Sequence, residues 1–459
     1  MKINNNMSAV IANGQLKKAE NRVAAAVERL SSGLRINHAG DDPAGMAISQ
    51  KMKSQIRGLG RASDNSADGV SVIETAEGAL TEVHAILNRM RELAVQSASD
   101  TNEAVDRESI QKEIDSLTVE VDRIAKDTEF NGVNLLDGSL DYRGYTDVSG
   151  VNVLTFAESV PTDKEYIIKV TTQPQQAKAS GGVMQGITSE AQEGALMLNG
   201  EIITFKKGDT ADDVLGKIRT LANRVGISVS GGATGYEYVT DAYGSAARVD
   251  FRCENPDLAT ALGLDALIGN PTYGIDTAIS FEKGFEDTAS YSATGTRVEI
   301  TDRNGFSIEM EVDPAVEKEK LVTLDIMDIG GMNLQIGANE NEVMVLKIPA
   351  TTCHALDIEN LNFLSREGSG EAITTLDEAI GRVSSTRASL GAYQNRLEHT
   401  ISSLDIAEEN MTSAMSRIED VDMAEEMSEY TAASVIQQAG ISVLGQANDV
   451  PQMVLQLLN

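Results

Sequence analysis

Apolar residues recur at every seventh position near the C-terminus of the chain. This spacing is typical of a long coiled-coil helix, about 60 Å long here at a rise of about 1.5 Å per residue. A second line of apolar residues lies between these positions, at Ile373, Ile380, Ile401 and Met415. A helix this long cannot bury its apolar stripe alone, so we expect partner helices. The heptad stripe consists of Leu376, Val383, Leu390, Leu397, Leu404, Met411 and Ile418.

Three runs nearer the N-terminus have apolar residues at spacings of three and four. Each run predicts a helix with one apolar face. The polar segment 97–106 joins the last two runs and is long enough for an antiparallel return. Because helices stand at both chain ends, we expect the two ends to pack together as a bundle. The runs are Leu16, Ala19, Val23, Ala26 and Leu30; Ile73, Ala76, Leu80, Val83, Leu87, Met90 and Ala94; and Ile110, Ile114, Leu117, Val121 and Ile124.

The middle of the chain, residues 140–350, has the pattern of β-strands with some helix. Glycine-rich turns separate alternating runs at 166–170, 297–300 and 306–310. Residues 196–229 predict a compact β-β-α-β module with a tight Asn199-Gly200 turn and a helix capped by Thr210. A hairpin is expected over 332–348. We therefore predict an α+β fold, in which a helical bundle built from both chain ends carries an inserted β-rich outer region.

Composition excludes several kinds of partner. Aromatic residues make up only 4% of the chain and Trp is absent, so the core is aliphatic and suits helix packing. The formal net charge of −32 disfavours binding to nucleic acid or to anionic membrane surfaces. No stretch approaches 18 apolar residues, so we expect no membrane insertion. The N-terminus lacks an apolar leader, which by itself predicts a cytoplasmic protein.

Few residues suggest catalysis. None of the four histidines lies within 140–330, so the middle region cannot hold a histidine triad or a histidine metal site. Asp41 and Asp42 are expected to cap a helix that begins at Pro43. Cys253 and Cys353 could form one bridge, but two separate buried thiols are favoured. We predict no enzyme activity, no catalytic residues, no cofactor and no metal.

Several segments together resemble bacterial flagellin, the subunit of the flagellar filament. They occur in the order of that family at both chain ends and cover residues 1–140 and 330–459. The N-terminal segments are Leu30–Asn37, Asp41–Gly45, Asp68-Gly69, Glu74–Leu80, Arg89–Gln96 and Phe130–Leu136. The C-terminal segments are Leu390–Leu397, Ser416–Asp420, Gln437–Gly440, Ala447–Gln452 and Leu457-Leu458.

The resemblance implies a structural subunit that self-assembles into the helical filament used for swimming. Such a subunit is exported through the flagellar secretion channel without a cleaved leader, which places it outside the cell, in the bacterial flagellum. The implied partners are other copies of the chain, an export chaperone, the filament cap and the hook-associated proteins. The resemblance also implies a host innate receptor, with Arg89, Leu93 and Glu113 as the recognition residues.

Three domains follow from the resemblance. Residues 1–40 with 421–459 would form the terminal helical domain that lines the filament core. Residues 41–140 with 331–420 would form the helical shaft and a β-hairpin, and 141–330 would be a variable, exposed insert. In compact flagellins the hairpin motif that resembles Leu334–Asn339 soon follows the Asn-Leu-Leu turn, so we place the insert before this hairpin. Asn459 replaces the arginine common at that end.

Two alternatives remain open. A hook–filament junction protein has similar terminal helices but does not polymerise extensively. The fuller match of the shaft motifs favours the filament subunit. The other alternative is a flagellin whose insert is adhesive or enzymatic, and the lack of histidine in 140–330 disfavours the metalloprotease version.

Overall fold

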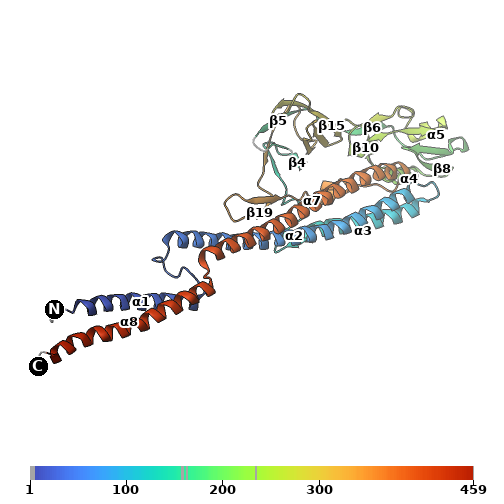
Figure 1. Ribbon diagram of the computed structural model, residues 1–459. Coiled ribbons are helices and arrows are strands. Elements are labelled where there is room, and N and C mark those ends of the chain that lie inside the picture. Colours follow the sequence, from blue (N-terminus) through green and yellow to red (C-terminus); the bar gives the residue numbers. More distant parts are fainter. Residues whose placement is uncertain (1–5, 157–159, 162–163, 233–234, 458–459) are drawn as a thin grey trace. The chain divides into compact units, whose positions relative to one another are not determined.

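The computed structural model describes residues 6–156, 160–161, 164–232 and 235–457, so the ends of the predicted terminal domain lie outside the described residues. The chain divides into two compact units. The first contains Met1–Asp68, Gln335–Val343 and Leu397–Asn459, and the second contains Gly69–Leu334 and Met344–Arg396. The helices are α1 (Met7–Ser32), α2 (Pro43–Ser97), α3 (Ala104–Asp127), α4 (Ala211–Arg224), α5 (Pro256–Leu262), α6 (Cys353–Leu356), α7 (Arg366–Glu419) and α8 (Met423–Leu457) (Figure 1).

The helical part of the second unit is built from α2, α3 and α7. All seven apolar positions predicted on α2 are buried, each at most 2% exposed. On α3, Ile114 and Val121 are buried in the same way. These positions confirm the predicted apolar faces of α2 and α3. The α+β fold class is also confirmed, because the described residues contain both helices and strands. The buried α2 residues are Ile73, Ala76, Leu80, Val83, Leu87, Met90 and Ala94.

Charged side chains set the antiparallel register of α2 and α7. Arg387 donates from Nε and Nη2 to one oxygen of Glu77, at 2.8 and 2.7 Å. About four turns further along α2, Arg91 Nε lies 2.5 Å from Asp377 Oδ1. Both pairs are partly exposed, so they specify alignment while the apolar stripe supplies most of the stability.

The heptad stripe on α7 changes character along its length. Leu376, Val383 and Leu390 in the second unit are at most 1% exposed. In the first unit Leu397 is buried, Leu404 is 9% exposed, and Met411 and Ile418 are partly exposed. The whole of α3 belongs to the second unit. The stripe is thus completely buried along its first part and becomes partly exposed at Met411 and Ile418.

In the first unit, α1 and α8 form an antiparallel pair. Asn6 donates to the carbonyl of Ala447 at 2.8 Å, and Arg22 pairs with Glu429 at 2.8 Å. Gly33 caps the C-terminal end of α1, and its φ of 73° is the left-handed conformation that favours glycine. Two residues after Gly33, the backbone N–H of Arg35 donates to the carbonyl of Glu419 at 2.6 Å.

The start of α2 agrees with the predicted capping. Asp41 Oδ2 accepts hydrogen bonds from the backbone N–H groups of Asn37 and His38, and these bonds lower the pKa of its carboxyl. Asp42 Oδ1 accepts from the Gly45 N–H at 2.9 Å. Pro43 is the first helical residue, where its fixed φ suits a helix start.

Twenty short strands complete the structure of the described residues, most of them in the β-rich region between α3 and α6. They are β1 (Glu129–Phe130), β2 (Val133–Asn134), β3 (Arg143–Thr146), β4 (Val151–Phe156), β5 (Glu165–Thr172), β6 (Gln176–Gly181), β7 (Gly194–Leu198), β8 (Glu201–Phe205), β9 (Ile227–Gly232), β10 (Gly235–Tyr243), β11 (Arg248–Val249), β12 (Phe251–Cys253), β13 (Thr272–Tyr273), β14 (Ala278–Lys283), β15 (Ser290–Thr294), β16 (Arg297–Thr301), β17 (Ser307–Val312), β18 (Leu321–Met327), β19 (Met332–Gln335) and β20 (Val343–Leu346).

The β-rich region has two separate hydrophobic cores. The first β-core uses residues between Val151 and Ile326 from the sheets β14-β5-β18-β3 and β15-β16-β17-β4. The second β-core uses residues between Ala177 and Leu264, from β6–β12, α4 and α5. Its sequence lies between β5 and β14, so the second β-core is inserted into the first.

The predicted β-β-α-β module has its elements at the expected positions. Asn199 and Gly200 have φ values of 47° and 92°, as a tight hairpin turn requires, and Thr210 caps α4 in a capping box with Asp213. The third strand, β9, does not join β7 and β8. It pairs instead with β10, the next strand along the chain, while β7 pairs with β8 and β12. The hairpin predicted over 332–348 is β19-β20.

The buried part of the stripe should carry more stability than the exposed apolar residues of the same helix. Leu390→Ala removes a side chain that is 1% exposed, so we expect a loss of about 2–5 kcal/mol in the free energy of unfolding. Ile406→Ala, at a position 56% exposed, should change it by less than about 0.5 kcal/mol. Urea unfolding of the monomer, followed by circular dichroism, measures both, and equal losses would contradict this assignment.

Candidate assembly and recognition surfaces

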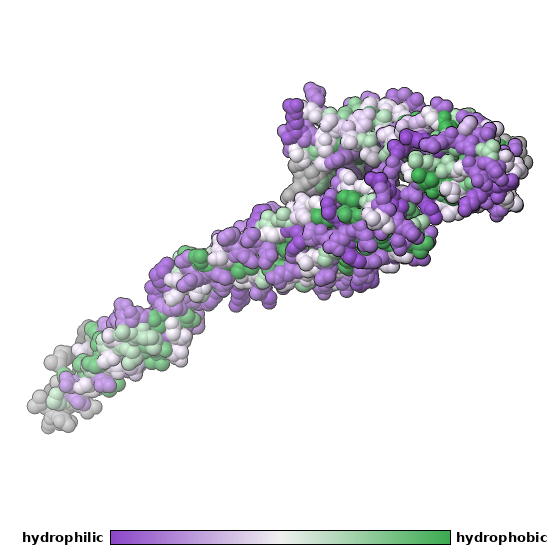
Figure 2. All heavy atoms as spheres, turned by 90° about the vertical axis from the view of Figure 1, so that its right-hand side faces the viewer, coloured by the Kyte–Doolittle hydropathy of each residue, from purple (hydrophilic) through white to green (hydrophobic). Residues whose placement is uncertain are grey.

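Large apolar side chains are exposed along both helices of the α1–α8 pair. Only Ala19, Ala26 and Ala433 are buried apolar residues of these helices among the described side chains, so the pair buries little of its own apolar surface. Figure 2 shows hydrophobic residues among the hydrophilic ones on the visible face of the first unit. Exposed patches of this kind are typical of interaction sites. The exposed residues are Met7, Val10, Ile11 and Val27 on α1, and Met423, Met427, Val435, Ile436, Ile441, Val443, Val450 and Met453 on α8.

The structure brings together two of the three predicted recognition residues. Arg89 on α2 donates from Nη2 to Glu113 Oε1 on α3 at 2.9 Å, and both side chains are about half exposed. The hydrogen bond to Glu113 raises the pKa of Arg89. Leu93 lies one turn further along α2 but is only 2% exposed. Its side chain therefore packs inside the helical bundle and supports the surface from beneath, a placement that the sequence pattern did not predict.

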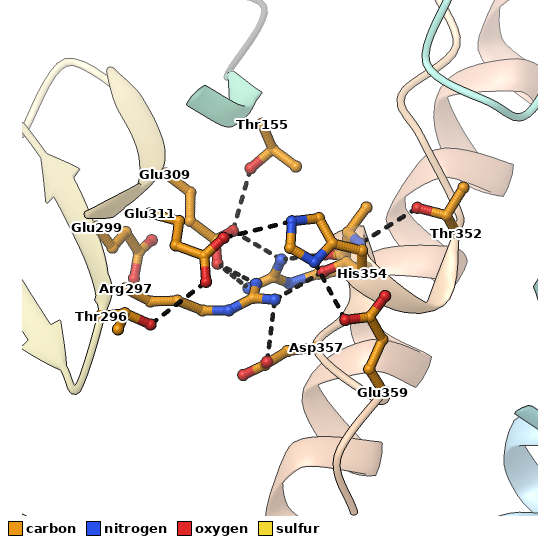
Figure 3. Close-up of polar contacts among 12 residues, drawn as sticks. Thr155, Thr296, Arg297, Glu299, Glu309, Glu311, Thr352, His354, Asp357 and Glu359 are labelled. Atoms are coloured by element: carbon orange, nitrogen blue, oxygen red, sulfur yellow. Dashed lines mark hydrogen bonds and ion pairs between the residues drawn. The ribbon is translucent and has the colours of Figure 1, made fainter. Parts of the chain in front are cut away.

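A polar cluster joins the first β-core to helices α6 and α7 (Figure 3). At its centre is Glu309 on β17, whose side chain is 9% exposed. Arg382 on α7 donates from Nη1 to Glu309 Oε2 at 2.7 Å and from Nη2 to Oε1 at 3.2 Å. Arg297 on β16 donates to Glu309 Oε1 at 3.1 Å, and Thr155 on β4 donates to Oε2 at 3.2 Å. One carboxylate therefore accepts from two guanidinium groups and a hydroxyl.

The same cluster includes the backbone of α6 and further carboxylates. Arg382 also donates to the carbonyl of Ala355, and Arg297 donates to the carbonyl of His354 at 2.6 Å. The His354 ring lies 3.5 Å from a Glu311 oxygen and 3.3 Å from a Glu359 oxygen. No sequence motif pointed to this cluster, because its residues come from distant segments of the chain.

The other residues considered for chemistry have structural surroundings. Both cysteines are free thiols, but only Cys353 is buried and Cys253 is partly exposed, so the expectation of two buried thiols is wrong for Cys253. Cys353 donates from Sγ to the Thr118 carbonyl at 3.0 Å. Burial raises the pKa of Cys353 to about 12, which disfavours the reactive thiolate. Among the described residues, no group of three or more His, Cys, Asp or Glu residues could hold a metal ion. None of the helices in the described part of the chain is long and apolar enough to span a membrane.

Long helices from both chain ends that carry an inserted β-rich region define a helical structural protein. Residues 3–141 match the model of the bacterial flagellin N-terminal helical region, and residues 373–458 match that of the C-terminal helical region. The chain is 36% identical over 454 residues to a flagellin from Clostridium tyrobutyricum, covering 98% of this chain and 100% of the relative. The chain therefore belongs to the flagellin family, whose members are structural subunits of the bacterial flagellar filament.

Other relatives agree along the full length of the chain. A flagellin from Bacillus subtilis (strain 168) is 34% identical over 460 residues, covering 100% of both chains. A flagellin from Salmonella typhimurium is 32% identical and covers 99% of each chain. The solved structure of FliC from Burkholderia pseudomallei is 20% identical, covers 72% of this chain and 99% of its own, and has a TM-score of 0.25, which is too low to establish a shared fold.

Because of the Arg91–Asp377 pair, we expect the stability of the fold to decrease slightly at acid pH. The hydrogen bond from Arg91 lowers the pKa of Asp377 below its ordinary value of 3.8. The pair therefore stabilises the fold above the unfolded-state pKa, and this contribution is lost as the pH falls through the folded-state pKa. Between about pH 5 and pH 2, we expect the melting temperature of Asp377→Asn to fall less than that of the unmodified chain. The double variant Arg91→Gln, Asp377→Asn should follow the same curve as Asp377→Asn, and parallel curves for all three proteins would contradict the role of the pair.

Proposed function

We propose that this flagellin self-assembles into filaments through the exposed apolar residues of α1 and α8. The proposal rests on the observation that the α1–α8 pair leaves apolar residues such as Ile441 (56% exposed) and Val443 (52% exposed) uncovered. Burying one such side chain contributes about 1.5–3 kcal/mol, so a few of them per contact suffice for stable association. A head-to-tail contact that does not close on itself produces an open helical polymer.

The finer features of the function belong to the same proposal. The subunit would leave the cell through the flagellar secretion channel with the help of an export chaperone, and would work outside the cell. It would meet the filament cap and hook-associated proteins at the two ends of the polymer. Residues 1–40 with 421–459 would line the filament core, 41–140 with 331–420 would form the shaft, and 141–330 would face outward.

Substitution of the exposed apolar residues should separate assembly from folding. In Ile441→Ser, Val443→Ser, we expect the free energy of unfolding of the monomer to change little, because both side chains are exposed. The critical concentration for filament formation should rise at least about tenfold, since the contacts between copies lose apolar area. Salt-induced polymerisation, followed by sedimentation and electron microscopy, measures this concentration.

The matched control is Ile202→Ser on β8, an exposed apolar position (54%) in the β-rich region, which should polymerise normally. Normal polymerisation of the α8 variant would contradict the proposed surface. The same experiment distinguishes the remaining alternative. A hook–filament junction protein would give no long filaments even without substitution, whereas a filament subunit forms them once salt screens the net charge of −32.

We further propose that a host innate receptor recognises the monomer at Arg89 and Glu113, with Leu93 supporting this surface. The observation in favour is that Arg89 and Glu113 form an exposed charged pair across α2 and α3. Arginine is enriched among the residues that dominate binding energy. Neighbouring subunits would cover the site in the filament.

Arg89→Ala should weaken receptor binding to the monomer by about tenfold or more, because it removes the exposed arginine of the pair. Leu93→Ala should weaken it too, together with the stability of the bundle, because the side chain is 2% exposed. Arg123→Ala, in an exposed ion pair further along α3, serves as the control and should bind normally. Surface plasmon resonance with immobilised receptor measures all three, and unchanged binding by both Arg89→Ala and Leu93→Ala would refute the site.

A further inference from the structure

The β-rich region folds on its own apolar contacts. Among the residues that the structure describes, neither the first nor the second β-core contains a residue of α2, α3, α6 or α7. Where β16 and β17 meet α6 and α7, the contacts described above are hydrogen bonds and ion pairs centred on Glu309. Polar interfaces within one chain resemble transient protein–protein contacts, so relative motion is the expected behaviour.

The connection between the first β-core and the helical part is narrow. The chain enters at Asp141 and returns at Gly330, and a Cβ added at Gly330 would lie 1.6 Å from the carbonyl oxygen of Asp141. The two crossing segments therefore lie against each other with no space for a side chain. Lys347 lies beside this neck, 2.9 Å from Asp328 and 3.6 Å from the Tyr142 ring centroid.

We propose that Glu309 and Arg382 form a latch that holds the first β-core on α6 and α7, and that breaking the latch lets the first β-core swing away on its narrow neck. Glu309 belongs to the β-sheet and Arg382 to the helix, so their bond crosses the interface. A buried carboxylate that loses one of its cationic partners keeps its desolvation cost without full compensation. The docked arrangement is then disfavoured, whereas release lets water reach Glu309.

The charged groups around this latch are unequal in number. Two guanidinium groups, of Arg297 and Arg382, face four carboxylates in the cluster, with His354 between two of them. The carboxylates belong to Glu309, Glu311, Asp357 and Glu359. Removing Arg382 leaves one guanidinium group facing four carboxylates, so repulsion among the carboxylates should add to the loss of the Arg382–Glu309 bond. Arg382→Gln should therefore release the first β-core more completely than Glu309→Gln, which removes one of the negative charges.

The second β-core has polar contacts of its own with the helices. Arg107 on α3 lies 3.3 Å from Glu201 on β8, with both side chains largely buried. Arg248 on β11 lies 2.5 Å from Glu367 on α7. Because these pairs are separate from Glu309, we expect the latch to release the first β-core alone.

Distance measurement between two spin labels tests the latch in the full-length monomer. The labels are placed at Asp287→Cys, in the loop after β14, and at Ser385→Cys on α7, both at exposed positions. Cys253→Ser removes the partly exposed thiol, and Cys353 stays because it is 1% exposed. We expect one narrow distance distribution for the docked protein. In Arg382→Gln the released population should rise by about a hundredfold and appear as a second, broader distribution.

Glu165→Gln is the matched control, because it removes an exposed ion pair with Lys283 on the same β-core and should leave the distribution unchanged. Unchanged narrow distributions in both Arg382→Gln and Glu309→Gln would overturn the latch. Loss of β-structure in Glu309→Gln, detected by circular dichroism, would also overturn it, since Glu309 would then be needed for the β-core itself.

Discussion

The structure depends on the burial of one long apolar stripe on α7 by helices from the other end of the chain. A stripe of this length exposes too much apolar surface for a single helix, so α2 and α3 must return beside it. Where all three helices are present, Leu376, Val383 and Leu390 are almost completely buried. The Arg387–Glu77 and Arg91–Asp377 pairs then fix the alignment of α2 with α7, and their charged side chains stay partly exposed to solvent. Helical segments that are far apart in sequence are consequently brought together in the second unit.

This constraint explains how a large β-rich region can be inserted without disturbing the helices. The region begins after α3 and ends before α7, so it interrupts a connection and leaves the packed helices continuous. It builds two cores from its own strands, and its bonds to the helices are polar. Polar docking supplies orientation, while the apolar cores supply stability. The helical part and the β-rich region can therefore differ in rigidity and in surface chemistry within one chain.

The sequence predicted the helices well because their apolar positions repeat with a helical period, as at Ile73, Leu80 and Leu87. Turn chemistry also identified the Asn199-Gly200 hairpin and the Thr210 cap. It did not predict that β9 would pair with β10, because strand partners depend on which strands the tertiary structure brings together. The Glu309 cluster gave no sequence signal for the same reason. The burial of Leu93 depends on how α2 and α3 rotate toward each other, and a motif match does not contain that information.

The change in burial along α7 separates apolar residues that the single chain covers from apolar residues that it leaves exposed. Leu390 on the apolar stripe is 1% exposed, whereas Met411 and Ile418 on the same stripe are partly exposed. In the first unit α7 carries the exposed Ile406, and α1 and α8 carry further apolar residues that the helix pair leaves exposed. Apolar residues that a single copy leaves exposed are the ones available to contacts between copies. The same hydrophobic effect that closes the bundle can therefore extend it from one subunit to the next.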